Sequence, residues 1–396
     1  MFEDFNINYF KLVFIIMIDL DSIDSFKSLD GKGQLAMMTN WSNMILESFN
    51  KGKSVKIPEQ VSTKSFNLNY NKDFNQIGIC GMGGSGISGE FLQNYLQDVN
   101  FHIPVTLVRG YKLPKNFTSN SFIVIVSYSG NTRETLTCLH ESLKRNIAVV
   151  LISSGGTCLE LSEKSKIPLV LLQKSYEPRA AFPALFGAIS GVFFQKFKEL
   201  NFLESDLTNL TELLKKQNDL YEPNVPLKNN IAKQLAKKWL NVVPIFLSEY
   251  LCLGMRMKGQ MNENSKKMAF YDTFPEMMHN TTQSWKDENL NLLPFHFVRT
   301  LIHNDTEMHD KTTYGLELAK YKSLSHVDEL DFSQSNDNLL VRMFLATYLV
   351  DYASIYLAFL RNVDPSFIDI VVGMKNKFEP ELTKKFDVKE ALLSLF

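Results

Sequence analysis

Two glycine- and serine-rich segments, Ile77–Ile87 and Phe122–Thr132, contain the residue types and spacing best suited to chemistry. Each segment follows a short β-branched apolar run and leads into a predicted helix, where free backbone N–H groups and the helix dipole favour an anion. The candidate phosphate-binding residues are Gly83, Gly84, Ser85, Ser127, Ser129 and Thr132. Because the two loops stand on consecutive strand–helix units, we expect them to grip one phosphate from two sides. The sequence therefore predicts a small phosphorylated metabolite as ligand.

The elements that position these loops alternate regularly along the first half of the chain. Expected strands are Gln76–Cys80, Val105–Val108, Phe122–Val126, Ala148–Ile152 and Pro168–Leu172. Expected helices between them are Glu90–Leu96, Glu134–Lys144 and Leu159–Lys164, with further helical stretches at 33–50 and 183–220. Continuous apolar strands separated by helices indicate a parallel sheet covered on both faces, whose ligands bind beyond the carboxyl ends of the strands. Both donor-rich loops are expected there.

The second half resumes the alternation after a proline-containing linker, Tyr221–Leu227. Its expected helices are Asn230–Trp239, Cys252–Asn262, Val341–Leu360 and Ile368–Phe378, and its expected strands are Val242–Leu247 and Phe295–Leu301. We therefore expect an α/β fold of two doubly wound, flavodoxin-like parallel-sheet domains, at 17–225 and 226–396. Residues 1–16 are expected to be a disordered extension before a natural start at Met17.

Composition limits the classes of function. At 396 residues, 45% apolar and 21% charged, the chain is long enough for two globular domains. The formal net charge of −1 offers no basic field for nucleic acid. Four dispersed cysteines and seven dispersed histidines show no metal-ligand spacing, so we expect no metal, no cofactor and reduced thiols in the cytoplasm. The apolar stretch Tyr9–Met17 is too short to span a bilayer, and no membrane partner is expected.

Two alternative interpretations concern the same loops. Gly81–Gly86 satisfies the GxGxxG dinucleotide pattern, but the second strand ends at Arg109 and offers no carboxylate for a ribose. The second loop has no place in a dinucleotide site, which disfavours that interpretation. Asn131 and Glu134 could instead form a capping box at a helix start, a role compatible with phosphate binding nearby.

At these residues the chain resembles the sugar isomerase (SIS) domain family, and within it the two-domain phosphoglucose/phosphomannose isomerase group. The resemblance spans about three-quarters of the chain, and its segments occur in the order of that group. They are Gly81–Ile87, Ser127–Thr132, Pro178–Pro183, Gln260–Asn264, Phe274–Asn280 and Val363–Lys375. The resemblance implies two SIS-type domains and a homodimer with active sites at the subunit interface.

The resemblance also implies candidate catalytic residues. Glu263 matches the position of the base that moves a proton between C1 and C2, and Arg179 matches a cation beside the enediolate. His279, which the group brings from the partner subunit, and Lys375 match positions for ring opening, and Glu276 is a weaker candidate for a second acid. The base needs a pKa near working pH, and a carboxylate shielded from water meets that need.

We therefore expect a cofactor-free aldose–ketose isomerase that acts on glucose 6-phosphate, with mannose 6-phosphate as a second substrate and fructose 6-phosphate as product. The alternative is a non-catalytic SIS-type protein that binds a sugar phosphate for regulation. A protein of that kind would keep the loops at Ser85 and Ser127 but could lose Glu263, which this chain retains.

Overall fold

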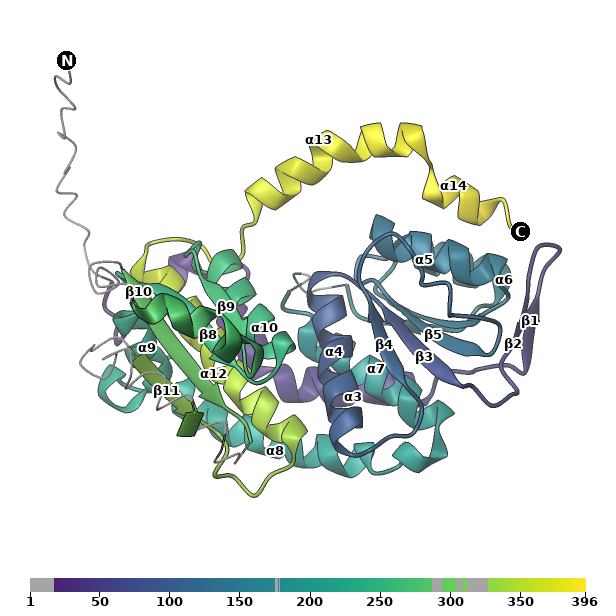
Figure 1. The fold of residues 1–396 in the computed structure, drawn as a ribbon. Coiled ribbons are helices and arrows are strands. Elements are labelled where there is room, and N and C mark those ends of the chain that lie inside the picture. Colours follow the sequence, from purple (N-terminus) through teal and green to yellow (C-terminus); the bar gives the residue numbers. More distant parts are fainter. Residues whose placement is uncertain are drawn as a thin grey trace, which may run out of the picture.

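The computed structural model of the protein describes residues 18–174, 177, 179–286, 294–303, 307, 310–311 and 327–396. The chain forms two parallel sheets, one from strands before residue 225 in the sequence and one from strands after it. Each sheet packs against helices (Figure 1). The expected α/β class with two doubly wound sheets is confirmed. The domain boundary near residue 225 stays a prediction, and the extension expected at 1–16 lies outside the described residues.

The first sheet has five parallel strands in the order β4-β3-β5-β6-β7. Strands β5 and β6 are buried along their whole length, which explains why they are continuous apolar runs. The strands are β3 Gln76–Cys80, β4 Val105–Val108, β5 Ser121–Val126, β6 Ala148–Ser153 and β7 Leu169–Leu171. The helices that follow them are α4 Gly83–Asp98, α5 Arg133–Lys144 and α6 Gly156–Ser165.

Helices α3 (Trp41–Lys53) and α7 (Phe182–Lys196) pack together on the side of this sheet where α4 lies. Two glycines of α7 allow the close approach, because a Cβ at Gly187 or Gly191 would lie 2.2 Å from the carbonyl oxygen of Ile45 or Phe49. Any larger side chain would push the two helices apart.

The second sheet has four parallel strands in the order β11-β10-β8-β9. In both sheets the first strand is internal, the second pairs with it on one side, and the third pairs with it on the other. The strands are β8 Val243–Ser248, β9 Phe270–Thr273, β10 Phe295–Leu301 and β11 Val327–Asp331. The main helices of this half are α9 Ile231–Lys238, α10 Leu251–Glu263 and α12 Leu339–Leu360.

Shorter elements complete the described chain. Helix α8 joins the two halves and packs on α3 and α12, and a small antiparallel hairpin pairs β1 with β2. These elements are α1 Ile23–Phe26, α2 Gln34–Thr39, β1 Gln60–Ser62, β2 Asn67–Asn69 and α8 Leu203–Tyr221. The 3-10 helices are η1 Lys27–Leu29, η2 Lys198–Leu200, η3 Leu227–Asn229, η4 Glu276–His279 and η5 Thr281–Lys286.

Helix α12 forms the centre of the core between the two halves. Within the described ranges it alone is long and apolar enough to cross a membrane. The stretch that meets this criterion is, however, entirely buried inside the protein. It contacts α4, α8, α9 and α10, as expected for a core helix that is apolar on all sides.

The C-terminal segment crosses from the second half back to the first. Helix α13 (Asp369–Lys385) extends beyond the expected end at Phe378, and none of its residues is buried. Helix α14 (Val388–Leu393) then packs against α5 and α6 through the buried Val388 and Leu392. In Figure 1 α13, in yellow, arches over the molecule between these two attachments.

Candidate active site

The first donor-rich loop forms the turn from β3 into α4. Gly83 has a φ of 51°, a left-handed conformation that suits glycine, and opens the helix. The first-turn N–H groups of Gly83 and Gly84 have no acceptor within the helix, so they are available to an anion. Ser85 lies in the same turn and is buried.

The second loop turns from β5 into α5, whose first turn begins after Thr132. The Ser127 hydroxyl donates to Thr132 Oγ1 at 3.0 Å and accepts from the Thr132 backbone N–H at 3.3 Å. The expected capping box is wrong: Asn131 Oδ1 accepts from the N–H and hydroxyl of Thr157 instead, so it ties this loop to α6. The hydroxyls of Ser127, Ser129 and Thr132 therefore remain together at one helix start.

A third loop, Ser153–Thr157 after β6, supports the second and was not predicted as part of the site. Ser154 donates through its N–H and its hydroxyl to the carbonyl of Tyr128, at 2.8 and 2.7 Å. The contact is close because Gly130 has a φ of 71° and a Cβ there would lie 1.8 Å from the Gly155 oxygen. The run Ser153-Ser-Gly-Gly-Thr157 is the sequence signal that could have identified this support.

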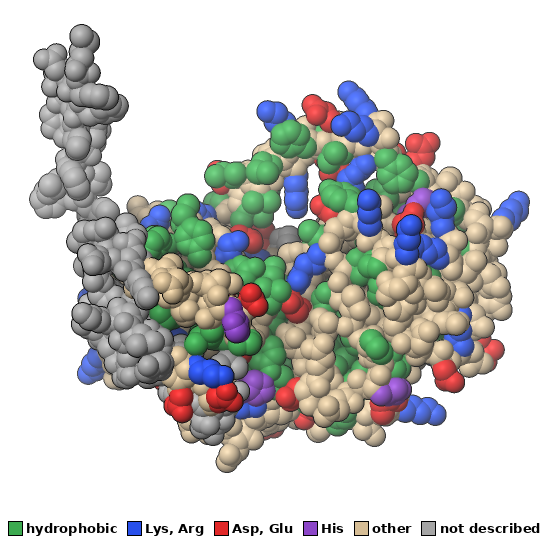
Figure 2. All heavy atoms as spheres, in the orientation of Figure 1, with side chains coloured by type: hydrophobic (Ala, Val, Ile, Leu, Met, Phe, Trp, Pro, Cys, Tyr) green, Lys and Arg blue, Asp and Glu red, His purple; other side chains and the backbone are tan. Residues whose placement is uncertain are grey.

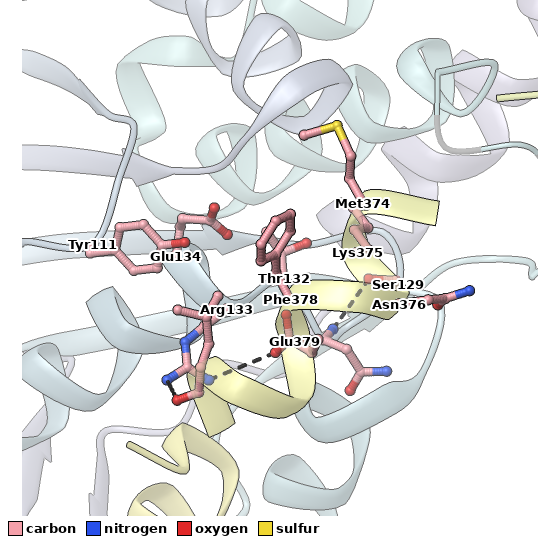
Figure 3. A pocket seen from close by; sticks show the side chains of 12 residues that line it. Tyr111, Ser129, Thr132, Arg133, Glu134, Met374, Lys375, Asn376, Phe378 and Glu379 are labelled. Atoms are coloured by element: carbon pink, nitrogen blue, oxygen red, sulfur yellow. Dashed lines mark hydrogen bonds and ion pairs between the residues drawn. The ribbon is translucent and has the colours of Figure 1, made fainter. Parts of the chain in front are cut away.

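A cavity of about 430 Å³ separates this second loop from α13 (Figure 3). Ser129, Thr132 and Tyr111 line it from the first half, and Met374, Lys375 and Phe378 line it from α13. Arg133 fixes the far end of α13, because its guanidinium donates to the carbonyls of Leu382, at 2.9 Å, and Phe386. The structure thus brings Lys375 to the predicted phosphate loop.

Arg179 and Glu263 form a second cluster beside the start of α13. Glu263 is the last residue of α10, as expected, and its Oε2 lies 3.8 Å from Nη1 of the buried Arg179. Nε of Arg179 donates to Asn264 Oδ1 at 2.7 Å, and Nη2 donates to the carbonyl of Pro365. Burial lowers the pKa of the Arg179 guanidinium, and the Glu263 carboxylate opposes that shift. An arginine, whose reference pKa is above 12, stays charged under these conditions.

Lys266, which sequence reasoning missed, ties the second cluster to the segment that precedes α13. Its ammonium donates to the carbonyls of Glu263 at 2.8 Å, Asn264 at 3.1 Å and Asp364 at 2.7 Å. It therefore holds the end of α10 against the segment that leads into α13. Burial and, next, the Arg179 charge lower the pKa of Lys266 to about 8.

The structure does not bring His279 to these groups. His279 ends η4 on the surface of the second half, and within the described residues no hydrogen bond or ion pair joins it to Arg179, Glu263 or Lys375. Glu276, in the same short helix, is also exposed and accepts from Asn280 at 3.3 Å. The side chain of Glu263 is 41% exposed, so a single chain does not give it the expected shielding from water.

Two further residue sets bear on cofactors. Arg109, a candidate for a dinucleotide 2′-phosphate, forms an ion pair with Glu90 of α4. Among the described residues no group of three or more His, Cys, Asp or Glu side chains could hold a metal ion. All four cysteines, including Cys80 in β3, are buried and form no disulfide.

Comparisons with known proteins show which family this chain is similar to. Residues 228–378 match the family model described as bacterial phospho-glucose isomerase C-terminal SIS domain. A bifunctional phosphoglucose/phosphomannose isomerase of Caldicellulosiruptor bescii is 30% identical over 332 residues, covering 81% of this chain and 96% of the relative. A D-glucosamine-6-phosphate 4-epimerase of Sulfolobus acidocaldarius is 31% identical, covering 56% of this chain and 67% of the relative.

The fold is also found among solved structures. A hypothetical protein of Thermus thermophilus aligns with a TM-score of 0.65 and 14% identity, covering 88% of this chain and 90% of that one. At this identity the match concerns the fold alone.

Proposed function

Since this chain belongs to the bifunctional phosphoglucose/phosphomannose isomerase family, we propose that it interconverts glucose 6-phosphate and mannose 6-phosphate with fructose 6-phosphate. The reaction opens the sugar ring and moves a proton between C1 and C2 through an enediolate. The observation that carries the proposal is the buried Arg179 beside the carboxylate of Glu263, near the start of the segment that brings Lys375 to the second loop, at Ser129 and Thr132.

The protein binds the substrate through its phosphate group. Backbone N–H groups of Gly83 and Gly84, with the hydroxyls of Ser85, Ser127, Ser129 and Thr132, hold it at the starts of α4 and α5. Because this group is remote from the reacting carbons, its contacts contribute to binding in the ground state and in the transition state alike.

The reacting carbons lie at Glu263 and Arg179. Glu263 removes the proton from C2 of the aldose and returns it to C1, and Arg179 stabilises the charge that grows on the enediolate oxygen. Among the described residues the Nη1 amino group of Arg179 has no hydrogen-bond partner, and it lies 3.8 Å from Glu263 Oε2, so its N–H groups remain for a substrate oxygen. Lys375 assists at the ring oxygen or a hydroxyl.

A homodimer completes this site. His279 is exposed and separate from the other groups within one chain, and the Glu263 side chain is partly open to water. A second copy that brings its own His279 to this opening supplies the acid for ring opening and excludes water from the base. Apolar side chains of α13, including Ile370 and Met374, are exposed in one chain and are available to such a contact. Figure 2 shows hydrophobic side chains, in green, along the arch that α13 forms. We assign the dimer to the cytoplasm.

A coupled assay on both aldose 6-phosphates tests the activity. Glu263→Gln should keep substrate binding and lose at least about two orders of magnitude in kcat, the usual contribution of a positioned base. Wild type that binds hexose phosphates without turnover would favour the regulatory alternative, and C4 epimerisation of glucosamine 6-phosphate would favour the activity named for the Sulfolobus relative.

Mixing two inactive variants tests the shared site. Heterodimers of Glu263→Gln with His279→Asn contain one site with both native residues, so a denatured and refolded mixture should recover about a quarter of wild-type activity. Each variant refolded alone is the control. Failure of the mixture to regain activity, with dimers present, would place both residues in one chain.

A further inference from the structure

Helix α12 carries one carboxylate, Asp351, in its buried interior. Asp351 is fully buried, and burial raises the pKa of its carboxyl group, against the opposing charge of Arg256. Nη2 of Arg256 donates to Asp351 Oδ2 at 2.5 Å. A buried ion pair of this kind is costly, and well-packed apolar residues often serve stability equally well. Its presence in an apolar helix calls for a role other than packing.

Arg256, on α10, connects this carboxylate to Arg179. Its Nη1 donates to the carbonyl oxygen of Arg179 at 3.0 Å, and its guanidinium lies 4.5 Å from the ring centre of Phe182. Arg256 is buried and is fixed by the carboxylate, the ring and the carbonyl together. It therefore holds the backbone of Arg179 in place.

A second connection starts one turn further along α12, at Ser354. The Ser354 hydroxyl accepts from Asn264 Nδ2 at 2.8 Å, and Asn264 Oδ1 accepts from Arg179 Nε at 2.7 Å. The first connection fixes the backbone of Arg179 and the second fixes its guanidinium. The Nη1 amino group is left beside Glu263, 3.8 Å from its Oε2.

We propose that Asp351 and Ser354 of α12 are positioning residues that fix Arg179, through Arg256 and Asn264, at the angle needed to stabilise the enediolate. The inference rests on the isomerase function proposed above. If the guanidinium is displaced by about 1 Å, the enzyme still binds substrate through the phosphate loops. The displaced guanidinium, however, stabilises the transition state poorly. Loss of the network should therefore reduce kcat and leave KM nearly unchanged.

Asp328 offers a matched control in the same half of the chain. It is also a buried carboxylate, and it accepts from His296 and Trp239 and pairs with Lys238. These groups lie near the amino ends of β10 and β11. Helix α10 begins at the opposite end of the sheet, where the carboxyl ends of the strands lie. Asp328→Asn removes a buried charge without touching Arg179.

The experiment compares kcat, KM for fructose 6-phosphate and thermal stability in wild type, Asp351→Asn, Ser354→Ala, Asp328→Asn and the apolar pair Arg256→Met/Asp351→Leu. We expect kcat to fall about 10- to 100-fold in both Asp351 variants and about threefold in Ser354→Ala, with KM within about threefold. The apolar pair should be about as stable as wild type and Asp328→Asn less stable, with the latter keeping wild-type kcat.

Wild-type kcat in a folded apolar pair, or an equal fall of kcat in Asp328→Asn at the same loss of stability, would overturn the proposal. If the Asp351 variants do not fold, Ser354→Ala decides, because wild-type kcat in that variant would equally exclude the network. An inactive wild-type enzyme would refute the proposed function, whereas an active wild type with unaffected variants refutes this inference alone.

Discussion

The two sheets differ at the carboxyl ends of their strands, although the strands follow the same order. After β3 and β5 the chain presents glycine, hydroxyl groups and first-turn N–H groups. After β8 the corresponding position contains Glu249. Its Oε2 accepts the backbone N–H groups of two residues that follow β10, Ile302 at 2.8 Å and His303 at 2.9 Å. The second sheet thus directs the same kind of backbone donors at a carboxylate of its own chain.

This difference shows what the fold provides and what the side chains decide. In both halves, the turn from a parallel strand into the next element leaves backbone N–H groups at the carboxyl ends of the strands. Glycine and serine leave that position open to an anionic ligand, and glutamate fills it. The first half is therefore expected to bind the phosphate, and the second half to use its polar residues for its own structure and for the reacting carbons.

Ser127→Ala tests the first half and should have the largest effect of the three changes that sharpen this comparison. Loss of one hydrogen bond to a charged group costs about 1.5–3 kcal/mol, so KM for fructose 6-phosphate should rise about tenfold or more with kcat largely kept. Ser142→Ala is the matched control, since Ser142 is a buried serine of α5 whose hydroxyl donates to the Cys138 carbonyl oxygen at 2.8 Å. Equal KM values in the two variants would remove Ser127 from phosphate binding.

Asp328→Asn tests whether polar groups of the second half serve stability. Burial alone would raise the pKa of Asp328, but hydrogen bonds from His296, Lys238 and Trp239 prevail and lower it from 3.8 to about 2. Between these values the unfolded chain binds more protons, so the contribution to stability is complete above about pH 4 and is lost toward pH 2. Denaturant unfolding should show a loss of about 2 kcal/mol at pH 7 in the variant, and a smaller loss at pH 3. A pH-independent difference would contradict this account.

Glu249→Gln should have the smallest effect. The amide oxygen can still accept from Ile302 and His303, but without the charge, so stability should fall by about 1 kcal/mol. KM for the phosphorylated substrate should not change, as measured in the same coupled assay. A raised KM would mean that the second sheet edge also contributes to the substrate site.

The central strands were predictable from sequence, and the edge strands of the second sheet were not. The observed β3, β4 and β10 have the predicted bounds, because their apolar runs leave little ambiguity, even though β4 lies at the edge of the first sheet. Strands β9 and β11, which were not predicted, lie at the two edges of their sheet. Val327–Asp331 alternates with acidic residues and Phe270–Thr273 has no buried residue, so neither shows a core pattern.

The site was predictable where a single segment carries its signal. The glycine–serine loops and the end of α10 at Glu263 follow from local residue types. The support from Asp351, Ser354 and Lys266 does not, because those contacts join segments about a hundred residues apart. The exposure of α13 could not be predicted either, since apolar spacing alone does not say which surface a helix meets.

The C-terminal segment links access to the site with its chemistry. Its root is held at Pro365 by Arg179, and its far end is held by Arg133 and by the docking of α14 on the first half. Lys375 lies between these two anchors, above Ser129 and Thr132. The position of Lys375 over these two hydroxyls therefore depends on anchors in both halves of the chain.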